Sequence, residues 1–378
     1  ERELAVVARS VDGAAPRTHP TAPRLVEEWT RVKRTVRSMH ERIFYRPMLA
    51  ALANAPADTT LTTDSARDRL AALGYQDTKA AMRHIEALSR GVSRRAEILR
   101  TLLPVLLDWL AEGVDPDAGL LNLRRVCDSL GTTPWFLRLL RDSNAAAERL
   151  CHILSSSRYV SDLLETSPES TAWLGDDSKL ATRSLDELVT EMWAQLSRHR
   201  DAAEAMRAVR QIRRREQLRI ALADTSGVAD VETTVAGLSD VDQATVMAAL
   251  HLARTEYERE NERSVPAEIL VVAMGRQGGR EIGFGSDADV MYAYEPAEGA
   301  EPQEAQEAAE RVLARMVKLL KQPCTPPILA ERILEIDNDL RPEGRSGAKV
   351  RSVASYAEYY ERWSETWERQ ALTRARYM

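Results

Sequence analysis

The chain has 378 residues, 44% hydrophobic and 29% charged, a globular composition with enough apolar residues for two or three domains. Its formal net charge of −6 argues against a general nucleic-acid binder, because such proteins present a basic surface. No apolar run approaches the roughly 18 residues that cross a bilayer. We therefore expect neither nucleic acid nor membrane among its partners.

Cysteine use and the first residues indicate a reducing compartment. The three cysteines, Cys127, Cys151 and Cys324, are odd in number, widely spaced and form no CxxC motif, so neither a disulfide framework nor a zinc site is expected. The opening ERELAVVARSVDG lacks the basic start and apolar core of a signal peptide. The sequence predicts a cytoplasmic protein.

Helices are expected along most of the chain before residue 260. In residues 97–113 and 135–154, apolar side chains recur at steps of three and four, the spacing of one helix face. Short breaks rich in Gly, Pro, Asp and Ser follow, at 113–119 and 165–170. This pattern predicts antiparallel helices without a regular repeat.

The composition changes at Pro266. Short apolar, β-branched runs at 267–274 and 287–295 predict buried strands. Residues 304–322 predict an amphipathic helix, ended by the prolines that follow, and residues 332–344 predict a third strand. The order strand, glycine loop, strand, helix, strand predicts a small α/β unit behind the helical region.

Two aspartates stand one residue apart at the start of the second predicted strand. Because residues i and i+2 of a strand share a face, Asp287 and Asp289 should project together and repel one another. Asp337, in the third predicted strand, is the expected third carboxylate, with Asp339 as the alternative on the same strand face. Oxygen-only ligands of this kind suit Mg²⁺ or Mn²⁺.

Glycines precede this acidic pair. Gly278 and Gly279, and then Gly285 with Ser286, would let backbone N–H groups and one hydroxyl approach the phosphates of a nucleotide. A lone DxD or a lone Gly-Gly is a weak signal, and surface turns contain many of both. The ordered set is the stronger signal, and it predicts nucleotidyl transfer from a bound nucleoside triphosphate with pyrophosphate leaving.

Two stretches resemble a known family. GRQGGREIGFGSDADVMYAYE (275–295) and the segment 337–378, with its LRPEGRSG, SYAEYYERW and WERQALTRAR, are similar to signatures of the glutamine synthetase adenylyltransferases. Residues 31–49, RVKRTVRSMHERIFYRPML, and 213–224, RRREQLRIALAD, also resemble it. The form LRPEGR resembles that of the actinobacterial branch.

The resemblance implies a fold and a domain order. The fold would be an all-α helical domain followed by a small polymerase-β-like mixed sheet with flanking helices. Residues 1–50 would be the tail of a preceding unit and a linker helix, 51–260 the helical domain, and 261–378 the catalytic domain. We expect the chain to be part of a longer protein, cut within this last domain.

The resemblance also implies an activity. Such enzymes add AMP to a tyrosine of glutamine synthetase, regulating nitrogen assimilation, and the segment order here resembles the adenylylating, C-terminal unit. Carried over to this sequence, Asp287, Asp289 and Asp337 would be the catalytic, metal-binding acids. Gly278, Gly279, Gly285 and Ser286 would contact phosphates, and Arg341 would bind either a phosphate or one of the acids, or form a buried structural ion pair.

Two alternatives stay open. The unit could instead remove AMP by phosphorolysis, or the chain could act as a helical docking fragment that binds glutamine synthetase or the PII signal protein.

Two side-chain patterns have more ordinary explanations. We expect Trp363, Trp367 and the tyrosines near them to be core residues and not adenine stackers. The basic run at 212–216 should be a solvated or salt-bridged helix face, with a docking face for glutamine synthetase or for the catalytic domain as the alternative.

Overall fold

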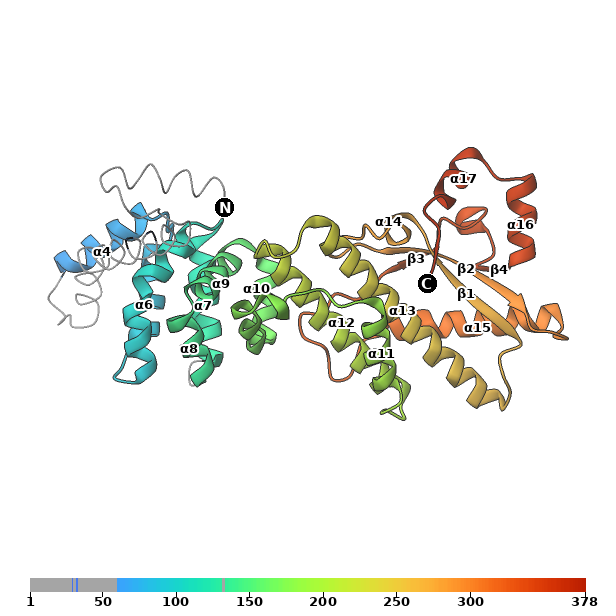
Figure 1. The fold of residues 1–378 in the computed structure, drawn as a ribbon, viewed down its shortest axis with the longest axis horizontal. Coiled ribbons are helices and arrows are strands. Elements are labelled where there is room, and N and C mark those ends of the chain that lie inside the picture. The colour runs from blue at the N-terminus through green and yellow to red at the C-terminus, as the bar shows by residue number, and fades with distance from the viewer. Residues whose placement is uncertain (1–28, 30–31, 33–59, 131–132) are drawn as a thin grey trace, which may run out of the picture. The chain divides into compact units, whose positions relative to one another are not determined.

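The parts of the chain that the computed structural model describes are residues 29, 32, 60–130 and 133–378 (Figure 1). They belong to two compact units, which divide between Ser156 and Ser157. The expected segment 1–50 lies outside the described residues, apart from residues 29 and 32. The domain boundaries that we expect at residues 50 and 260 stay predictions.

The described part of the first unit is helical. Leu99, Leu103 and Leu110 of α6 are fully buried, as their spacing predicts, and α6, α7 and α9 pack together. Residues 135–154, which show one apolar pattern, belong to two helices. The backbone is extended at Ser143, so one helix ends at Asp142 and the next begins at Asn144. The helices are α4 (Thr60–Ala72), α5 (Thr78–Ser89), α6 (Arg94–Ala111), α7 (Pro116–Leu130), α8 (Pro134–Asp142) and α9 (Asn144–Ser156).

The second unit begins with helices and ends with a sheet. Its longest helix, α13, packs against α11, α12 and α15. The helical elements before the sheet are α10 (Arg158–Thr166), η2 (Pro168–Gly175), η3 (Asp177–Lys179), α11 (Leu185–Leu196), α12 (Ala202–Thr225) and α13 (Val231–Asn261). Those within and after it are α14 (Gly275–Gly278), α15 (Pro302–Lys321), η4 (Gly344–Ser346), α16 (Val353–Arg362) and α17 (Thr366–Leu372).

The sheet is mixed and has five strands, which confirms the expected fold class. β1 pairs antiparallel with β2 on one side and with β5 on the other. β3 and β4 both lie parallel to β2 along its other edge, one after the other. The strands are β1 (Ala267–Ala273), β2 (Ala288–Pro296), β3 (Ile336–Asp337), β4 (Val350–Ser352) and β5 (Arg376–Tyr377).

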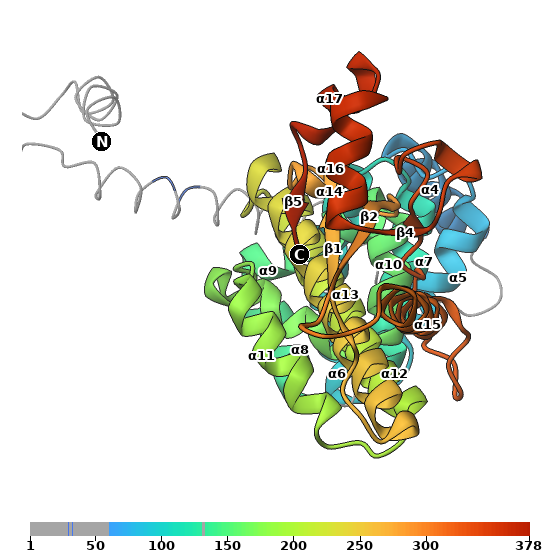
Figure 2. The same ribbon diagram turned by 90° about the vertical axis from the view of Figure 1, so that its right-hand side faces the viewer.

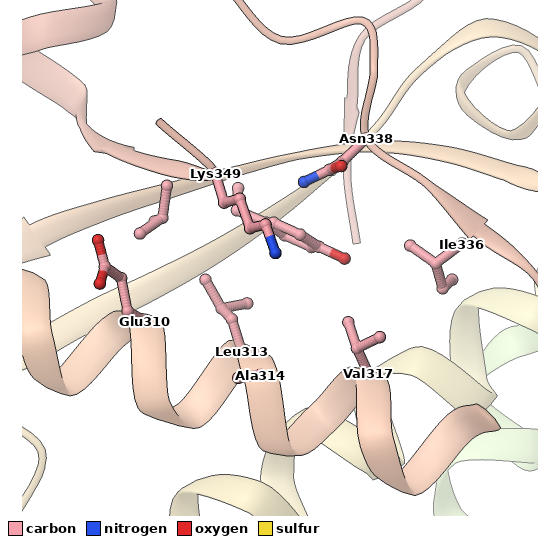
Figure 3. Close-up of a pocket in the computed structure, with 9 residues that line it drawn as sticks. Glu310, Leu313, Ala314, Val317, Ile336, Asn338 and Lys349 are labelled. Carbon is pink, nitrogen blue, oxygen red and sulfur yellow. The ribbon is translucent and has the colours of Figure 1, made fainter. Parts of the chain in front are cut away.

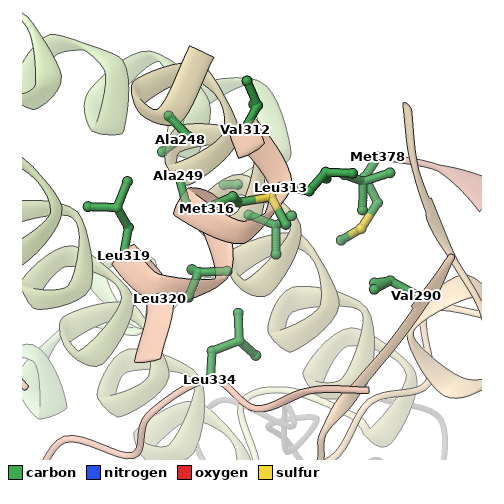
Figure 4. Close-up of a cluster of buried hydrophobic side chains, with 14 of the residues drawn as sticks. Ala248, Ala249, Val290, Val312, Leu313, Met316, Leu319, Leu320, Leu334 and Met378 are labelled. Atoms are coloured by element: carbon green, nitrogen blue, oxygen red, sulfur yellow. The ribbon is translucent and has the colours of Figure 1, made fainter. Parts of the chain in front are cut away.

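The two faces of the sheet have different neighbours (Figure 2). Val290 and Tyr292 of β2 face the helices α13 and α15, where they join a large apolar core (Figure 4). Met291 faces the opposite side, because strand residues alternate, and its sulfur accepts a hydrogen bond from Tyr360 Oη of α16 at 3.8 Å. The odd-numbered side chains at the start of β2 therefore lie on the α16 side of the sheet.

Buried arginines of α12 hold the loop that leads into β3. Arg210 donates to Glu331 at 2.6 Å, and Arg213 pairs with Asp242 at 2.6 Å and donates to the carbonyl of Arg332 at 2.5 Å. The expected salt bridges are present, but they are buried and not solvated. Both of these arginines bind residues 322–332, within the expected catalytic domain, as the alternative of a docking face for that domain predicts. These contacts fix the approach of the chain to Asp337.

Two expectations are wrong. The strand expected over 332–344 is only the two residues of β3, because the chain turns directly after Asp337 and η4 and its flanking turns follow. Trp363 and Trp367 are not core residues, since they are 72% and 52% exposed. The helical spacing of these residues is interrupted, because α16 ends at Arg362 and α17 begins at Thr366.

Among the described residues, no helix has both the length and the apolar character needed to cross a membrane.

Candidate active site

The three predicted carboxylates meet at one edge of the sheet. Asp287 directly precedes β2, Asp289 lies in it, and Asp337 of β3 is the register partner of Asp289. One ligand oxygen from each of the three lies within 4.8 Å of the other two. Asp287 and Asp289 share a face because strand residues alternate. The register pairing of Asp337 with Asp289 brings Asp337 to the same face.

Asp339 lies outside this cluster. Its carboxylate accepts hydrogen bonds from Arg345 Nε at 2.6 Å and Arg341 Nη1 at 3.3 Å, and the bond from Arg345 lowers its pKa. The backbone N–H of Asp339 in turn donates to Asp337 Oδ1 at 2.7 Å. Asp339 therefore pairs with arginines, whereas Asp337 contributes to the group of three acids.

The cluster carries excess negative charge. Burial, and then the charges of Asp287 and Asp337, raise the pKa of Asp289, while Arg276 opposes that rise. Arg276 Nη2 lies 3.5 Å from Asp287 Oδ1, and both side chains are about half exposed. Three carboxylates within reach of one another and only weakly compensated by a cation fit a site for a divalent metal ion with oxygen ligands.

Gly275 makes room for the carboxylate of Asp289. Its φ of +51° lies in the left-handed region, and a Cβ there would meet Asp289 Oδ2 at 2.3 Å. The preceding residue, Met274, donates its N–H to the carbonyl of Asp289 at 2.8 Å. The glycine loop and the acidic strand are therefore fitted to one another at this point.

Gly278 and Gly279 are tied into the short helix α14. Their N–H groups donate to the carbonyls of Met274 at 2.7 Å and Gly275 at 3.1 Å. A Cβ on Gly278 would lie 1.9 Å from the carbonyl oxygen of Arg374, so this glycine is required by close packing. The phosphate contacts expected for these two residues stay predictions, and contacts through their amides would require the turn to open.

Gly285 and Ser286 form the turn that enters the acidic strand. Gly285 has φ +72°, and a Cβ there would meet Arg332 Nη1 at 2.5 Å. The N–H of Ser286 donates to the carbonyl of Gly283 at 3.1 Å. The guanidinium of Arg332 also lies 4.2 Å from the centre of the Tyr159 ring, so a cation stands directly beside this turn.

Arg341 is buried and fully engaged in its own loop. It donates to the carbonyls of Asn338 at 2.8 Å, Arg345 at 3.1 Å and Gly347 at 3.2 Å, and to the side chains of Asn338 and Asp339. This arrangement matches the structural alternative for Arg341. Its contact with a phosphate stays a prediction.

Comparison with known proteins identifies the family. The sequence model of the glutamate-ammonia ligase adenylyltransferase family matches residues 147–378, which is more than half of the chain. The chain belongs to this family. The description of the family names an adenylyltransferase, which is the class of enzyme that the resemblance implies.

Curated relatives agree with this assignment. The chain is 46% identical to the bifunctional glutamine synthetase adenylyltransferase/adenylyl-removing enzyme of Streptomyces coelicolor, over 96% of the chain and 37% of that protein. It is 44% identical to the enzyme of the same name from Leifsonia xyli, over 100% of the chain and 36% of that protein. For Corynebacterium glutamicum the identity is 42%, over 91% and 33%. The chain thus spans about a third of the length of these relatives.

In this member of the adenylyltransferase family, residues outside the motifs also hold the glycine loop in place. Arg376 of β5 donates to the carbonyls of Gly278 at 3.2 Å and Gln277 at 3.1 Å, and also to Gln243 of α13. The side chain of Gln277 is fully buried and donates to the carbonyl of Ser239 at 2.9 Å. The loop beside Asp289 is therefore fixed from both α13 and the last strand.

A polar hollow of about 430 Å³ adjoins the carboxylates, and it is lined by Asp287, Asp337, Asp339 and Arg345 among others. The side chain of Arg345 is 88% exposed at its edge. Arg276 and Arg345 were not expected from the sequence. Arg276 lies inside the motif GRQGG and Arg345 inside LRPEGR. A basic residue in a motif that also supplies acidic ligands could have indicated both from the sequence.

Proposed function

We propose that the chain transfers AMP from ATP to a tyrosine hydroxyl of glutamine synthetase, which would regulate nitrogen assimilation. The observation that carries this proposal is the meeting of Asp287, Asp289 and Asp337 beside the glycine loop. The names of the relatives supply the acceptor, since those proteins act on glutamine synthetase. In this proposal the reaction takes place in the cytoplasm.

The chemistry is a displacement at phosphorus. The tyrosine oxygen forms a bond to the α-phosphorus of ATP, the bond to the β-phosphate oxygen breaks, and pyrophosphate leaves. The phenolic proton passes to a carboxylate of the cluster, for which Asp337 is our candidate, and then to water. Bound Mg²⁺ or Mn²⁺ would neutralise charge on the attacking and leaving oxygens.

Within this proposal each side chain has a task. Asp287, Asp289 and Asp337 would hold the metal, because one oxygen from each lies within 4.8 Å of the other two. Arg276 is exposed and only weakly paired with Asp287, so its guanidinium can turn towards a phosphate oxygen of the nucleotide. The Ser286 hydroxyl stands directly before the acidic pair and offers a further donor to the phosphates.

The reverse activity is the second candidate, because the relatives are also named adenylyl-removing enzymes. There, inorganic phosphate would attack the tyrosine-bound AMP and release ADP. The third candidate is a docking fragment that binds glutamine synthetase or PII without chemistry. These three candidate functions are distinguished by the products that the chain forms from defined substrates.

The test supplies the chain with two substrate pairs. One is ATP, Mg²⁺ and unmodified glutamine synthetase, and the other is phosphate, Mg²⁺ and the adenylylated enzyme. We expect label from [α-³²P]ATP on the synthetase in the first reaction, none with Asp287→Asn, and no ADP in the second. ADP release in the second reaction alone would reverse the assigned direction. Binding of the synthetase with neither reaction would favour the docking fragment.

A further inference from the structure

A cavity of about 530 Å³ lies between α15 and the sheet (Figure 3). Leu313 and Val317 of α15 form its apolar wall, and Ile336 of β3 lies at one end. Ile336 and Asn338 line both this cavity and the polar hollow beside the carboxylates, so the two spaces adjoin at β3. Tyr292, Leu313 and Val317 line this cavity and not the hollow.

The side chain of Tyr292, which also lines this cavity, has an unusual environment. It is only 4% exposed, and its buried hydroxyl has no hydrogen-bond partner among the described residues. Native proteins seldom leave a buried hydroxyl unpaired, because it loses its bonds to water without replacement. Burial raises the pKa of this phenol, so it stays protonated and keeps a proton to donate.

Two further donors face the same space. Figure 3 shows the ammonium group of Lys349 and the side-chain amide of Asn338 pointing into the cavity above Leu313 and Val317. The Asn338 oxygen already accepts a hydrogen bond from Arg341 Nη1 at 2.9 Å, which leaves its NH₂ group for the cavity. No ion pair joins Lys349 to another described residue, so its positive charge is available to a ligand.

The acidic group of the cavity stands apart from these donors. Glu310 lies at the end away from Ile336, and its carboxylate accepts a hydrogen bond from Gln306 Nε2 at 3.1 Å (Figure 3). The cavity thus combines an apolar wall with a cation, an amide NH₂ and a buried hydroxyl. Donors of this kind in one cavity with an apolar wall match an anion with two acceptor oxygens and a hydrocarbon body.

We propose that this cavity binds a small organic carboxylate with an apolar body, its carboxylate held by Lys349, Asn338 and Tyr292 and its hydrocarbon part by Leu313 and Val317. This site needs neither nucleotide nor metal. Its test is therefore independent of the proposed transferase activity.

The first experiment is an NMR titration of the whole chain labelled at its Ile, Leu and Val methyl groups. The probe is 4-methylpentanoate, and 4-methylpentan-1-ol has the same carbon skeleton without the charge. We expect the carboxylate to shift the methyl signals of Leu313, Val317 and Ile336 and to bind about tenfold more tightly than the alcohol, since hydrogen bonds to charged groups are the stronger ones. No shift of these signals, or equal affinity for the two probes, would overturn the proposal.

Three variants test the donors. Lys349→Gln should weaken carboxylate binding by about tenfold or more and Tyr292→Phe by about fivefold, as expected for a charged and a neutral hydrogen bond. Lys79→Gln, in the first unit, is the matched control and should bind the probe as the parent chain does. Unchanged affinity in Lys349→Gln would contradict the assigned cation.

Tyr292→Phe has a second readout that separates a ligand site from a structural hydroxyl. Removing an unpartnered buried hydroxyl should leave the melting temperature of the ligand-free chain unchanged or raise it. The probe should raise the melting temperature of the parent chain more than that of the variant. A lower melting temperature for ligand-free Tyr292→Phe would show that the hydroxyl has a structural partner, and the proposal would fail.

Discussion

Replacing Gly275 by alanine should displace the carboxylate of Asp289. The new Cβ would start 2.3 Å from Asp289 Oδ2, whereas ordinary contact begins near 3.4 Å, so the carboxylate must move by about an ångström. The left-handed backbone at φ +51° adds a separate penalty of about 1–2 kcal/mol in folding stability. A shift of about an ångström in a reacting group can lower the catalytic rate by about a hundredfold.

Gly299→Ala is the matched control for this variant. Gly299 also has positive φ, +76°, but a Cβ there meets nothing within 4 Å. Both variants should therefore lose similar stability in urea unfolding, and only Gly275→Ala should lose affinity for Mn²⁺ in calorimetry and activity in AMP transfer. If Gly275→Ala bound Mn²⁺ and transferred AMP as Gly299→Ala does, the fit between the glycine loop and Asp289 would not matter to the site.

Three other substitutions have expected outcomes. The raised pKa of Asp289 means that the folded state binds its proton more tightly than the unfolded chain, so stability from this group rises as the pH falls through that pKa. At neutral pH and without metal, the melting temperature of Asp289→Asn should thus be no lower than that of the parent chain. With Mg²⁺ present, the variant should nevertheless lose AMP transfer. A lower melting temperature would contradict the inference that the negative charge of the cluster is uncompensated. Arg376→Gln should cost about 1–3 kcal/mol in urea unfolding, because buried carbonyls lose their donor, whereas exposed Arg374→Gln should cost less than about 1 kcal/mol. Arg276→Ala should keep the parent's stability and lower kcat/KM for ATP about tenfold in steady-state assays; an unchanged value would remove Arg276 from the nucleotide site.

Almost all of the acidic cluster could be predicted from the sequence. Strand alternation predicts the shared face of Asp287 and Asp289, and a third acid on a neighbouring strand is the natural partner. The choice between Asp337 and Asp339 needs the structure. It depends on where β3 ends and on the arginines that pair with Asp339.

The close packing around Gly278 could not be predicted from the sequence. Gly278 must be small because the carbonyl of Arg374, far along the chain, lies against it, and Arg376 holds the same loop. Arg341 turns inward to its own loop, in agreement with one of the expectations for this residue. The contacts of Gly278 depend on the tertiary approach of a distant segment, which local spacing does not reveal.

The aromatic residues of the last helices illustrate a second limit. Helical spacing predicts one face for Trp363 and Trp367, but α16 ends at Arg362 and Trp367 lies in the next helix, and both side chains are exposed. The predicted third strand fails for a related reason. The chain turns where Arg341 collects backbone carbonyls, and that interaction outweighs the tendency to continue as a strand.

The central claim is that Asp287, Asp289 and Asp337 form the metal-binding centre of an AMP transferase. The most direct test is transfer of [α-³²P]AMP to glutamine synthetase by Asp337→Asn and, as its neighbour control, Asp339→Asn. We expect Asp337→Asn to lose at least about a hundredfold in rate and Asp339→Asn less than about tenfold, since only Asp337 belongs to the metal-binding group. Near-normal transfer by Asp337→Asn, or the greater loss in Asp339→Asn, would contradict the account.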